Sequence, residues 1–278
     1  MQFMLPPAKT IAAQVATALA EDIGAGDLTA QLIPANHTAT AQVICRESAI
    51  LCGSAWFEAC FQQLDKSVVI RWLASEGERI TPNQKVCEIH GNARAILTGE
   101  RCALNFLQTL SATATVTRAY VEAISGSNAL VMDTRKTLPG LRLAQKYAVT
   151  VGGGTNQRIG LFDGILIKEN HIAAAGGIAP ALATAAKHKT PVQIEVENLQ
   201  QLETALQHGA TLILLDNFDL ETLRAAVKIT GNHAQLEASG GVNLASIRAI
   251  AETGVHRISI GSLTKDVKAI DFSMRIIA

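Results

Sequence analysis

Residues 191–241 read PVQIEVENLQQLETALQHGATLILLDNFDLETLRAAVKITGNHAQLEASGG. Three short apolar runs (192–197, 211–216 and 235–239) alternate with two segments, Leu199–Gln207 and Leu220–Ile229, whose apolar residues recur at helical spacing. The run 211–216 is almost continuously apolar until it ends in Asp216, as in strands that are buried on both faces, and the other two runs also end in a polar residue. This alternation predicts βα units that build a parallel sheet.

The same alternation extends to both sides of this stretch. Further strand-like runs are found at Ala129–Asp133, Gly164–Lys168 and His256–Ile260, and further helices are predicted at Leu141–Val151 and Leu244–Glu252. The six βα units are two short of the usual eight of a TIM-type barrel. We therefore predict an open, incomplete βα barrel over residues 128–270, with a doubly wound sheet as the alternative.

Residues 1–127 show a different pattern of predicted strands and helices. Strand-like runs (Ala41–Cys45, Val68–Leu73, Lys85–Ile89) occur beside two predicted helices, Ile11–Ala20 and Trp56–Leu64. A long helix is predicted at Thr98–Ile124, where leucines recur at helical spacing and neither Pro nor Gly occurs between Glu100 and Ser125. This part is predicted to form a separate α/β domain, which the long helix connects to the barrel.

Composition narrows the class of protein. Of the 278 residues 48% are apolar, and 24 basic residues balance 24 acidic ones. A chain of this kind folds around a sizeable core, and a nucleic-acid partner is not expected because such proteins usually carry a basic excess. Neither a signal peptide nor a membrane-spanning run is recognised. Five cysteines without a CxxC pair predict free thiols and a cytoplasmic protein.

Each predicted barrel strand ends in an ionisable group or a glycine-rich turn. The six ends are Asp133–Lys136, Lys168–His171, Glu195–Glu197, Asp216–Asn217, Glu237–Gly241 and Gly261–Ser262. A single polar residue at a strand end is often only a helix cap. Since catalytic groups of βα barrels lie at the carboxyl ends of the strands, six such ends at one rim predict an active site.

The last two strand ends are rich in glycine. Ser239-Gly240-Gly241 and Gly261-Ser262 are each predicted to open a helix, whose free backbone N–H groups and dipole favour a phosphate. The alternative is that these glycines only turn the chain.

The charges at the rim are segregated. Residues 135–168 hold six basic side chains and one acid, whereas residues 195–237 hold seven acids and two bases. Arginine forks suit carboxylates and phosphates, and carboxylates suit a Mg²⁺ ion that bridges phosphates. The two zones predict a small, highly charged substrate that carries carboxylates, together with a metal-bound polyphosphate.

Several segments, read in order, resemble the quinolinate phosphoribosyltransferase family. They are EDIGAGDLTA (21–30), GERCALNFLQTLS (99–111), DTRKTLPGLR (133–142), KYAVTVGGGTNQRIGLFDGILIKENHI (146–172), EVEN (195–198), LLDNF (214–218), EASGG (237–241) and GSLTKDVKAIDFSMR (261–275). The resemblance implies transfer of a phosphoribosyl group from phosphoribosyl pyrophosphate (PRPP) to quinolinate, with Mg²⁺ and with loss of pyrophosphate and CO₂. It implies an α/β sandwich over residues 1–127, on which residues 271–278 pack back, an open βα barrel over 128–270, and a homodimer.

The resemblance also assigns roles to individual residues. Quinolinate would be bound by Arg101 (reaching in from the neighbouring subunit), Thr134, Arg135, Gln157, Arg158 and Lys168. The phosphate groups of PRPP would be bound by Lys136, Ser239, Gly240, Gly241, Gly261 and Ser262. Catalysis would fall to Lys136, Lys168, Glu197 and Asp216, and the last two would hold the metal directly or through water.

Three positions depart from the family pattern. Gln157 stands where the family usually has histidine, Cys102 where it has threonine, and Lys265 where many members have histidine. Glutamine keeps a neutral donor but does not titrate.

Two alternatives stay open. Lys168, at the end of a predicted barrel strand, is placed as the Schiff-base lysine of an aldolase would be. The second alternative is a diverged relative of the family that binds an anion without catalysing a reaction. Its main support is Gln157.

Overall fold

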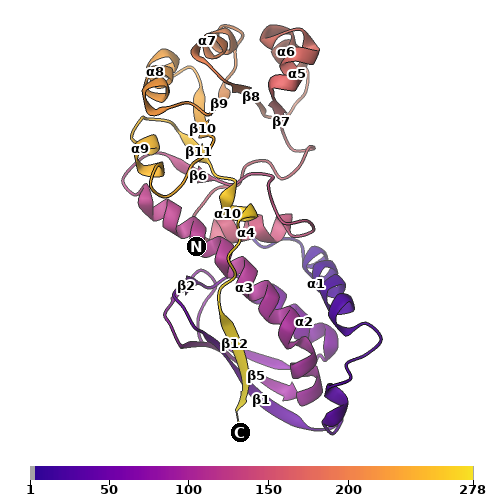
Figure 1. Cartoon of the computed structure of the whole chain (residues 1–278). Helices are drawn as coiled ribbons and strands as arrows, with labels where there is room; N and C mark the ends of the chain where they lie inside the picture. The colour runs from indigo at the N-terminus through magenta and orange to yellow at the C-terminus, as the bar shows by residue number, and fades with distance from the viewer. Residues whose placement is uncertain (1–3, 278) are drawn as a thin grey trace. The chain divides into compact units, whose positions relative to one another are not determined.

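The six predicted barrel strands form one parallel sheet, in the order β6-β11-β10-β9-β8-β7 (Figure 1). They are β6 (Leu130–Met132), β7 (Ile165–Ile167), β8 (Val192–Val196), β9 (Leu212–Asp216), β10 (Gln235–Ser239) and β11 (Arg257–Ser259). Each strand falls within its predicted run. Because β6 and β7 lie at opposite ends of this order, the sheet is open, which confirms the incomplete barrel.

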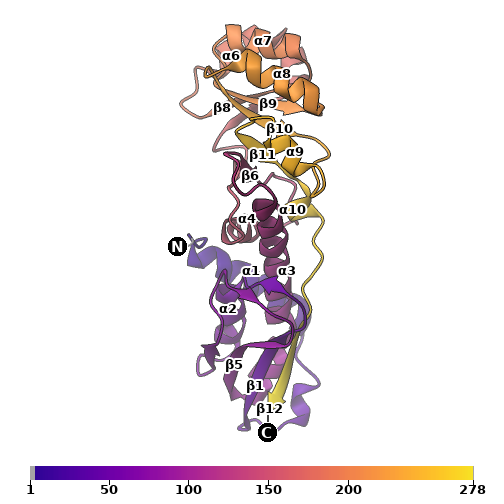
Figure 2. The ribbon, with the colours of Figure 1, turned by 90° about the vertical axis from the view of Figure 1, so that its left-hand side faces the viewer.

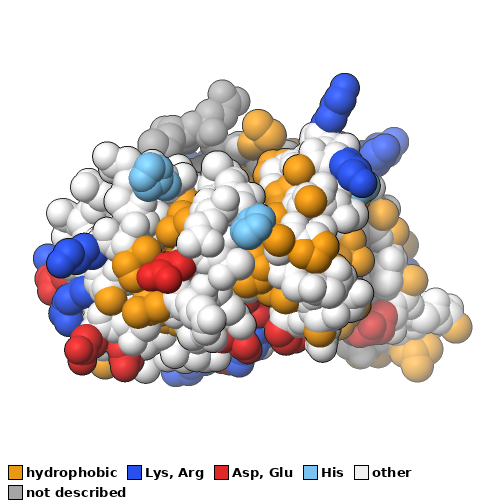
Figure 3. Space-filling view, turned by 90° about the horizontal axis from the view of Figure 1, so that it is seen from above, with side chains coloured by type: hydrophobic (Ala, Val, Ile, Leu, Met, Phe, Trp, Pro, Cys, Tyr) orange, Lys and Arg blue, Asp and Glu red, His pale blue; other side chains and the backbone are white. Residues whose placement is uncertain are grey.

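Helices follow the strands of this sheet. They are α5 (Glu169–Ala175), α6 (Ile178–Ala185), α7 (Leu199–Gln207), α8 (Leu220–Thr230) and α9 (Ile247–Ala251). The side chains of Asn198 and Asp219 cap α7 and α8 by accepting from the N–H groups of Gln201 and Thr222. The hydrogen bond from Thr222 lowers the pKa of Asp219. Seen from above, apolar side chains are interspersed among polar ones, and most charged side chains lie toward the edges of the view (Figure 3).

The structure is a computed structural model that describes residues 4–277, and the chain divides into two units. Unit 1 comprises the residues up to Arg118, Thr137–Gly153 and the residues from Thr264 onward. Unit 2, which holds the parallel sheet, comprises Ala119–Lys136 and Gly154–Leu263. None of the described helices is long and apolar enough to cross a membrane.

Unit 1 is built on an antiparallel sheet of order β12-β1-β5-β3 (Figure 2). Its strands are β1 (Thr38–Cys45), β3 (Val69–Trp72), β5 (Gln84–Asn92) and β12 (Phe272–Ile277), and β2 (Ala49–Ile50) pairs separately with β4 (Arg79–Ile80). The helical segments are α1 (Ala8–Ile23), η1 (Ala30–Leu32), α2 (Ser54–Leu64), α3 (Ala93–Ala123, continuing into unit 2), α4 (Arg142–Val151) and α10 (Ser262–Lys265, beginning in unit 2). The last strand, β12, pairs with β1 so that Cys45 lies opposite Phe272.

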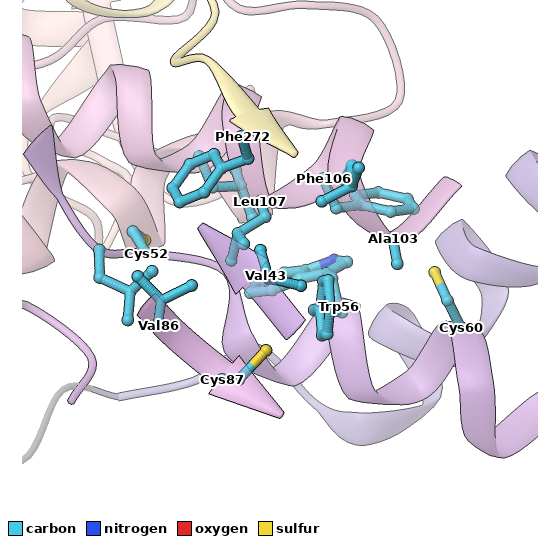
Figure 4. Close-up of a cluster of buried hydrophobic side chains, with 14 of the residues drawn as sticks. Val43, Cys52, Trp56, Cys60, Val86, Cys87, Ala103, Phe106, Leu107 and Phe272 are labelled. Carbon is cyan, nitrogen blue, oxygen red and sulfur yellow. The ribbon is translucent and has the colours of Figure 1, made fainter. Parts of the chain in front are cut away.

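The core of unit 1 lies between one face of the sheet and the helices. Alternate residues of β1 are buried, as expected for a strand with one covered face. Figure 4 shows Val43 from β1, Trp56 from α2 and Leu107 from α3 within this core, and none of the three is accessible to solvent.

The long helix begins five residues earlier than predicted. The side chain of Asn92 accepts hydrogen bonds from the N–H groups of Arg94 and Ala95 and so stabilises the free amides of the first turn. Gly99 lies inside α3, where a Cβ atom would come within 3.0 Å of Phe61 and Leu64.

All five cysteines are free and buried in unit 1. Burial raises their pKa values, that of Cys60 to about 12, which disfavours the reactive thiolate. We therefore expect the native protein to react with Ellman's reagent at pH 8 at least about 100-fold more slowly than the protein in denaturant, where five thiols should titrate. Fast labelling of any thiol under native conditions would contradict this burial.

Candidate active site

The carboxyl ends of the unit 2 strands surround a pocket of about 280 Å³. It is lined by Thr134, Arg135, Lys136, Gln157, Arg158, Leu166, Lys168, Glu195, Leu214, Glu237, Ser239 and Ser259. Seven of these were predicted site residues: Thr134, Arg135, Lys136, Gln157, Arg158, Lys168 and Ser239. The spacing of two residues between Leu166 and Lys168, and between Glu237 and Ser239, explains why both members of each pair face the pocket.

The pocket has a positive charge balance. Its lining holds four cationic side chains (Arg135, Lys136, Arg158, Lys168) and two carboxylates (Glu195, Glu237), which gives a net charge of +2. Leu166 and Leu214 add apolar surface to the lining. This combination suits a flat apolar ring that carries two negative charges.

Arg158 and Arg135 are close enough to influence each other. Burial, and after it the charge of Arg135, lowers the pKa of Arg158, although the guanidinium stays protonated at neutral pH. The guanidinium also donates to the carbonyl oxygen of Gly164 at 3.3 Å. Two neighbouring cations in a half-buried position are unfavourable in isolation, and a bound anion would relieve that repulsion.

Lys168 pairs with a carboxylate on the next strand. Its Nζ atom lies 3.0 Å from Oε2 of Glu195, whose side chain is only 11% exposed. The ammonium is thus engaged by a carboxylate, whereas a Schiff-base nucleophile needs a free amine lone pair. The aldolase alternative gains no support from this geometry. The sequence placed Glu195 and Glu197 at the rim and on one face of the strand, but no individual role was predicted for Glu195.

A buried hydrogen-bond network lies at one side of the pocket. Glu237 is fully buried and accepts hydrogen bonds from Gln157 (2.9 and 3.1 Å), Gln193 (3.0 Å) and the hydroxyl of Ser259. Glu237 was predicted to lie at the rim but received no individual role, and Gln193 and Ser259 were not singled out. Their signal in the sequence is a polar residue at an inward-facing position of an otherwise apolar strand.

The prediction that Ser239-Gly240-Gly241 opens a helix is wrong. The next helix, α9, begins only at Ile247, because residues after Gly241 form a turn. Gly240 has φ +99°, and a Cβ atom there would lie 2.0 Å from Oδ1 of Asn217. The glycine therefore lets two strand ends approach each other closely. Ser262 does begin a helix, α10, but it is four residues long.

Glu197 and Asp216 do not line the 280 Å³ pocket. Glu197 is exposed beside a second hollow of about 240 Å³ that it shares with Glu169 and Glu195, and the carboxylate of Asp216 accepts from Asn217 Nδ2 at 2.8 Å. Within residues 4–277 no three His, Cys, Asp or Glu side chains form a metal-binding group. A pair of strand-end carboxylates nevertheless fits Mg²⁺, which commonly takes one or two protein carboxylates and completes its shell with phosphates and water.

The remaining predicted residues lie outside the pocket lining. Gly240, Gly241 and Gly261 follow the last two strands, and a Cβ atom at Gly261 would lie 3.1 Å from Cδ of Lys136. Arg101 lies on α3 in unit 1 and is exposed.

Family models match almost the whole chain. The model of the quinolinate phosphoribosyl transferase N-terminal domain matches residues 27–111, and that of the C-terminal domain matches residues 113–275. The chain belongs to the quinolinate phosphoribosyltransferase family. The family resemblance seen in the sequence is thereby confirmed.

Individual members of the family agree closely with this chain. The structure of the nicotinate-nucleotide pyrophosphorylase from Francisella tularensis matches with a TM-score of 0.95 and 48% identity, covering 98% of each chain. A probable nicotinate-nucleotide pyrophosphorylase [carboxylating] of Bacillus subtilis is 42% identical over 92% of this chain and 90% of its own length. The corresponding Synechocystis protein is 40% identical over 98% and 95%.

Proposed function

We propose that this family member transfers the phosphoribosyl group of PRPP to quinolinate with decarboxylation, giving nicotinate mononucleotide, pyrophosphate and CO₂, a step of NAD biosynthesis. The observation that carries the proposal is the pocket, whose lining has a net charge of +2 and includes two leucine side chains. Quinolinate is a flat pyridine ring with two carboxylates and complements this pocket in both charge and shape. The names of the relatives support the same reaction.

Quinolinate is bound by the cationic side of the pocket. Arg135 and Arg158 provide guanidinium forks for the carboxylates, Lys168 adds a third cation, and the hydroxyl of Thr134 lies beside them. Gln157 lines the same wall. The ion pair with Glu195 holds Lys168 in place before the substrate arrives.

PRPP is bound at the remaining strand ends. Lys136, Ser239, Gly240, Gly241, Gly261 and Ser262 contact its phosphate groups, and Glu197 and Asp216 hold Mg²⁺ directly or through water. The closeness of Gly261 to Lys136 supports this grouping. When bound, Mg²⁺ offsets the negative charge of pyrophosphate as it leaves.

The chemistry requires no covalent intermediate with the protein. As the bond between ribose C1 and pyrophosphate breaks, positive charge develops on the sugar, which Glu197 or Asp216 stabilises, and the pyridine nitrogen donates its electron pair to C1. The N-alkylated ring then accepts the electron pair of the breaking carbon–carboxylate bond as CO₂ leaves. A proton from solvent takes the vacated ring position. The cations of the pocket hold the ring in place throughout.

A homodimer and a cytoplasmic location complete the proposal. Arg101 is an exposed cation of unit 1, and in a dimer it would add a further positive charge to the site of the neighbouring subunit. The five free thiols support a reducing compartment.

A direct assay tests the function. With quinolinate, PRPP and Mg²⁺ we expect nicotinate mononucleotide and CO₂ in equal amounts, and no product once Mg²⁺ is chelated. Folded protein that forms no product would contradict the proposal and favour the non-catalytic alternative. Borohydride treatment with substrate present is expected to leave Lys168 unmodified, whereas a covalent adduct there would favour an aldolase.

A further inference from the structure

The hydrogen-bond network around Glu237 occupies all the polar groups of the Gln157 amide. An ionised carboxylate only accepts hydrogen bonds, so the Nε2 group of Gln157 faces Glu237. The same Nε2 group donates to Oε1 of Gln193 at 2.8 Å, while Oε1 of Gln157 accepts from the backbone N–H of Arg158 at 2.9 Å. Both amide hydrogens therefore have partners inside the protein, and neither is left to donate to a substrate.

The network connects a buried charge to a pocket arginine. Oε1 of Gln157 holds the backbone of Arg158, and the backbone N–H of Gln157 donates to Asp133 at 2.7 Å. Hydrogen bonds therefore hold the backbone N–H groups of both Gln157 and Arg158, and with them the segment that carries the Arg158 guanidinium. Orientation of this guanidinium matters because an arginine fork binds a carboxylate with defined geometry.

A purely structural role does not explain a carboxylate at position 237. Burying a charge among neutral donors is costly, and a well-packed neutral residue would usually stabilise the fold as well or better. Charge-assisted hydrogen bonds are shorter and stronger than neutral ones, which suits a group that must hold two amides in place.

We propose that Glu237 is a positioning residue of the quinolinate site, which acts through Gln157 on the segment that carries Arg158. The inference rests on the proposed function. It also changes the role of Gln157, whose side chain holds the backbone of Arg158 and does not bind quinolinate itself.

The first test is Glu237→Gln. The new side chain presents an N–H group where the carboxylate accepted, so the amide of Gln157 loses its orientation. We expect the dissociation constant of quinolinate, measured by calorimetry, to rise about tenfold, and the KM for PRPP to stay within about twofold. Glu203→Gln is the matched control, because it makes the same change on an exposed position of α7; it should leave both constants unchanged.

Gln193→Met provides a second route if Glu237→Gln does not fold. Gln193 is buried and is absent from the pocket lining, but it contacts both Gln157 and Glu237. Its replacement should weaken quinolinate binding about fivefold, an effect that only the network can transmit. If the folded variants lose thermal stability but bind quinolinate as tightly as the wild type, the network is only structural and the proposal is wrong.

A double-variant cycle tests the direction of the coupling. If Glu237 acts through Gln157, then Glu237→Gln added to Gln157→Met should weaken quinolinate binding by no more than about twofold beyond Gln157→Met alone. Multiplying losses would show that the two residues act independently and would overturn the inference. A wild-type protein that binds no quinolinate would instead refute the proposed function, so the two failures are distinct.

Discussion

Arg135→Ala is expected to abolish measurable quinolinate binding. Arg135 lies in the pocket beside Arg158, whose pKa it lowers, so the two guanidinium groups are close neighbours. Loss of one member of a desolvated charge pair costs roughly 2–5 kcal/mol, which corresponds to a loss of about 30-fold to several thousand-fold in affinity. The dissociation constant of quinolinate, measured by calorimetry, is the direct readout.

Two further variants define what Arg135 contributes. Arg135→Lys keeps the charge but loses the fork and should fall between the wild type and alanine. Arg224→Ala removes an exposed arginine from α8 and should leave binding unchanged. The melting temperature of Arg135→Ala should be measured beside the affinity, so that loss of binding is distinguished from loss of the fold. Unchanged quinolinate affinity would show that the carboxylates bind elsewhere.

Gly240→Ala is expected to impair both stability and turnover. Its φ of +99° is unfavourable for a residue with a side chain, and the new Cβ atom would lie 2.0 Å from Oδ1 and 3.0 Å from the backbone nitrogen of Asn217. The turn and Asn217 must therefore move apart, and with them the ends of β9 and β10. We expect a loss of about 2–3 kcal/mol in unfolding free energy and a rise of at least about tenfold in the KM for PRPP.

Two other glycines distinguish the effect of the Cβ clash from the effect of the positive φ angle. Gly241→Ala lies in the same turn with φ +58°, but its Cβ atom meets nothing within 4 Å, so its effect should be clearly smaller. Gly209→Ala has φ +77° and is equally unobstructed after α7, away from the pocket. It should lower the unfolding free energy by about 1 kcal/mol and keep full activity. Equal effects at all three positions would contradict the close approach of Asn217.

Much of the fold was readable from the sequence because parallel strands buried on both faces need continuous apolar runs. For this reason the run 211–216 predicted β9 to within one residue, and helical spacing of apolar residues predicted Leu199–Gln207 with its observed boundaries. The final strand, Phe272–Ile277, was not predicted as a strand from its residues, since its partner β1 lies more than 200 residues earlier. The start of α3 was placed too late because the capping role of Asn92 becomes visible only in three dimensions.

The sequence by itself determined which chemical groups reach the rim of the sheet. Strand periodicity places Lys168 and Ser239 at the pocket whatever the neighbouring strands do. Only the tertiary structure decided how these groups are paired: Lys168 with Glu195, and Glu237 with two glutamines. The physical reason is that pairing depends on the order and register of neighbouring strands, which are set by packing across the whole sheet and are not encoded within any one strand.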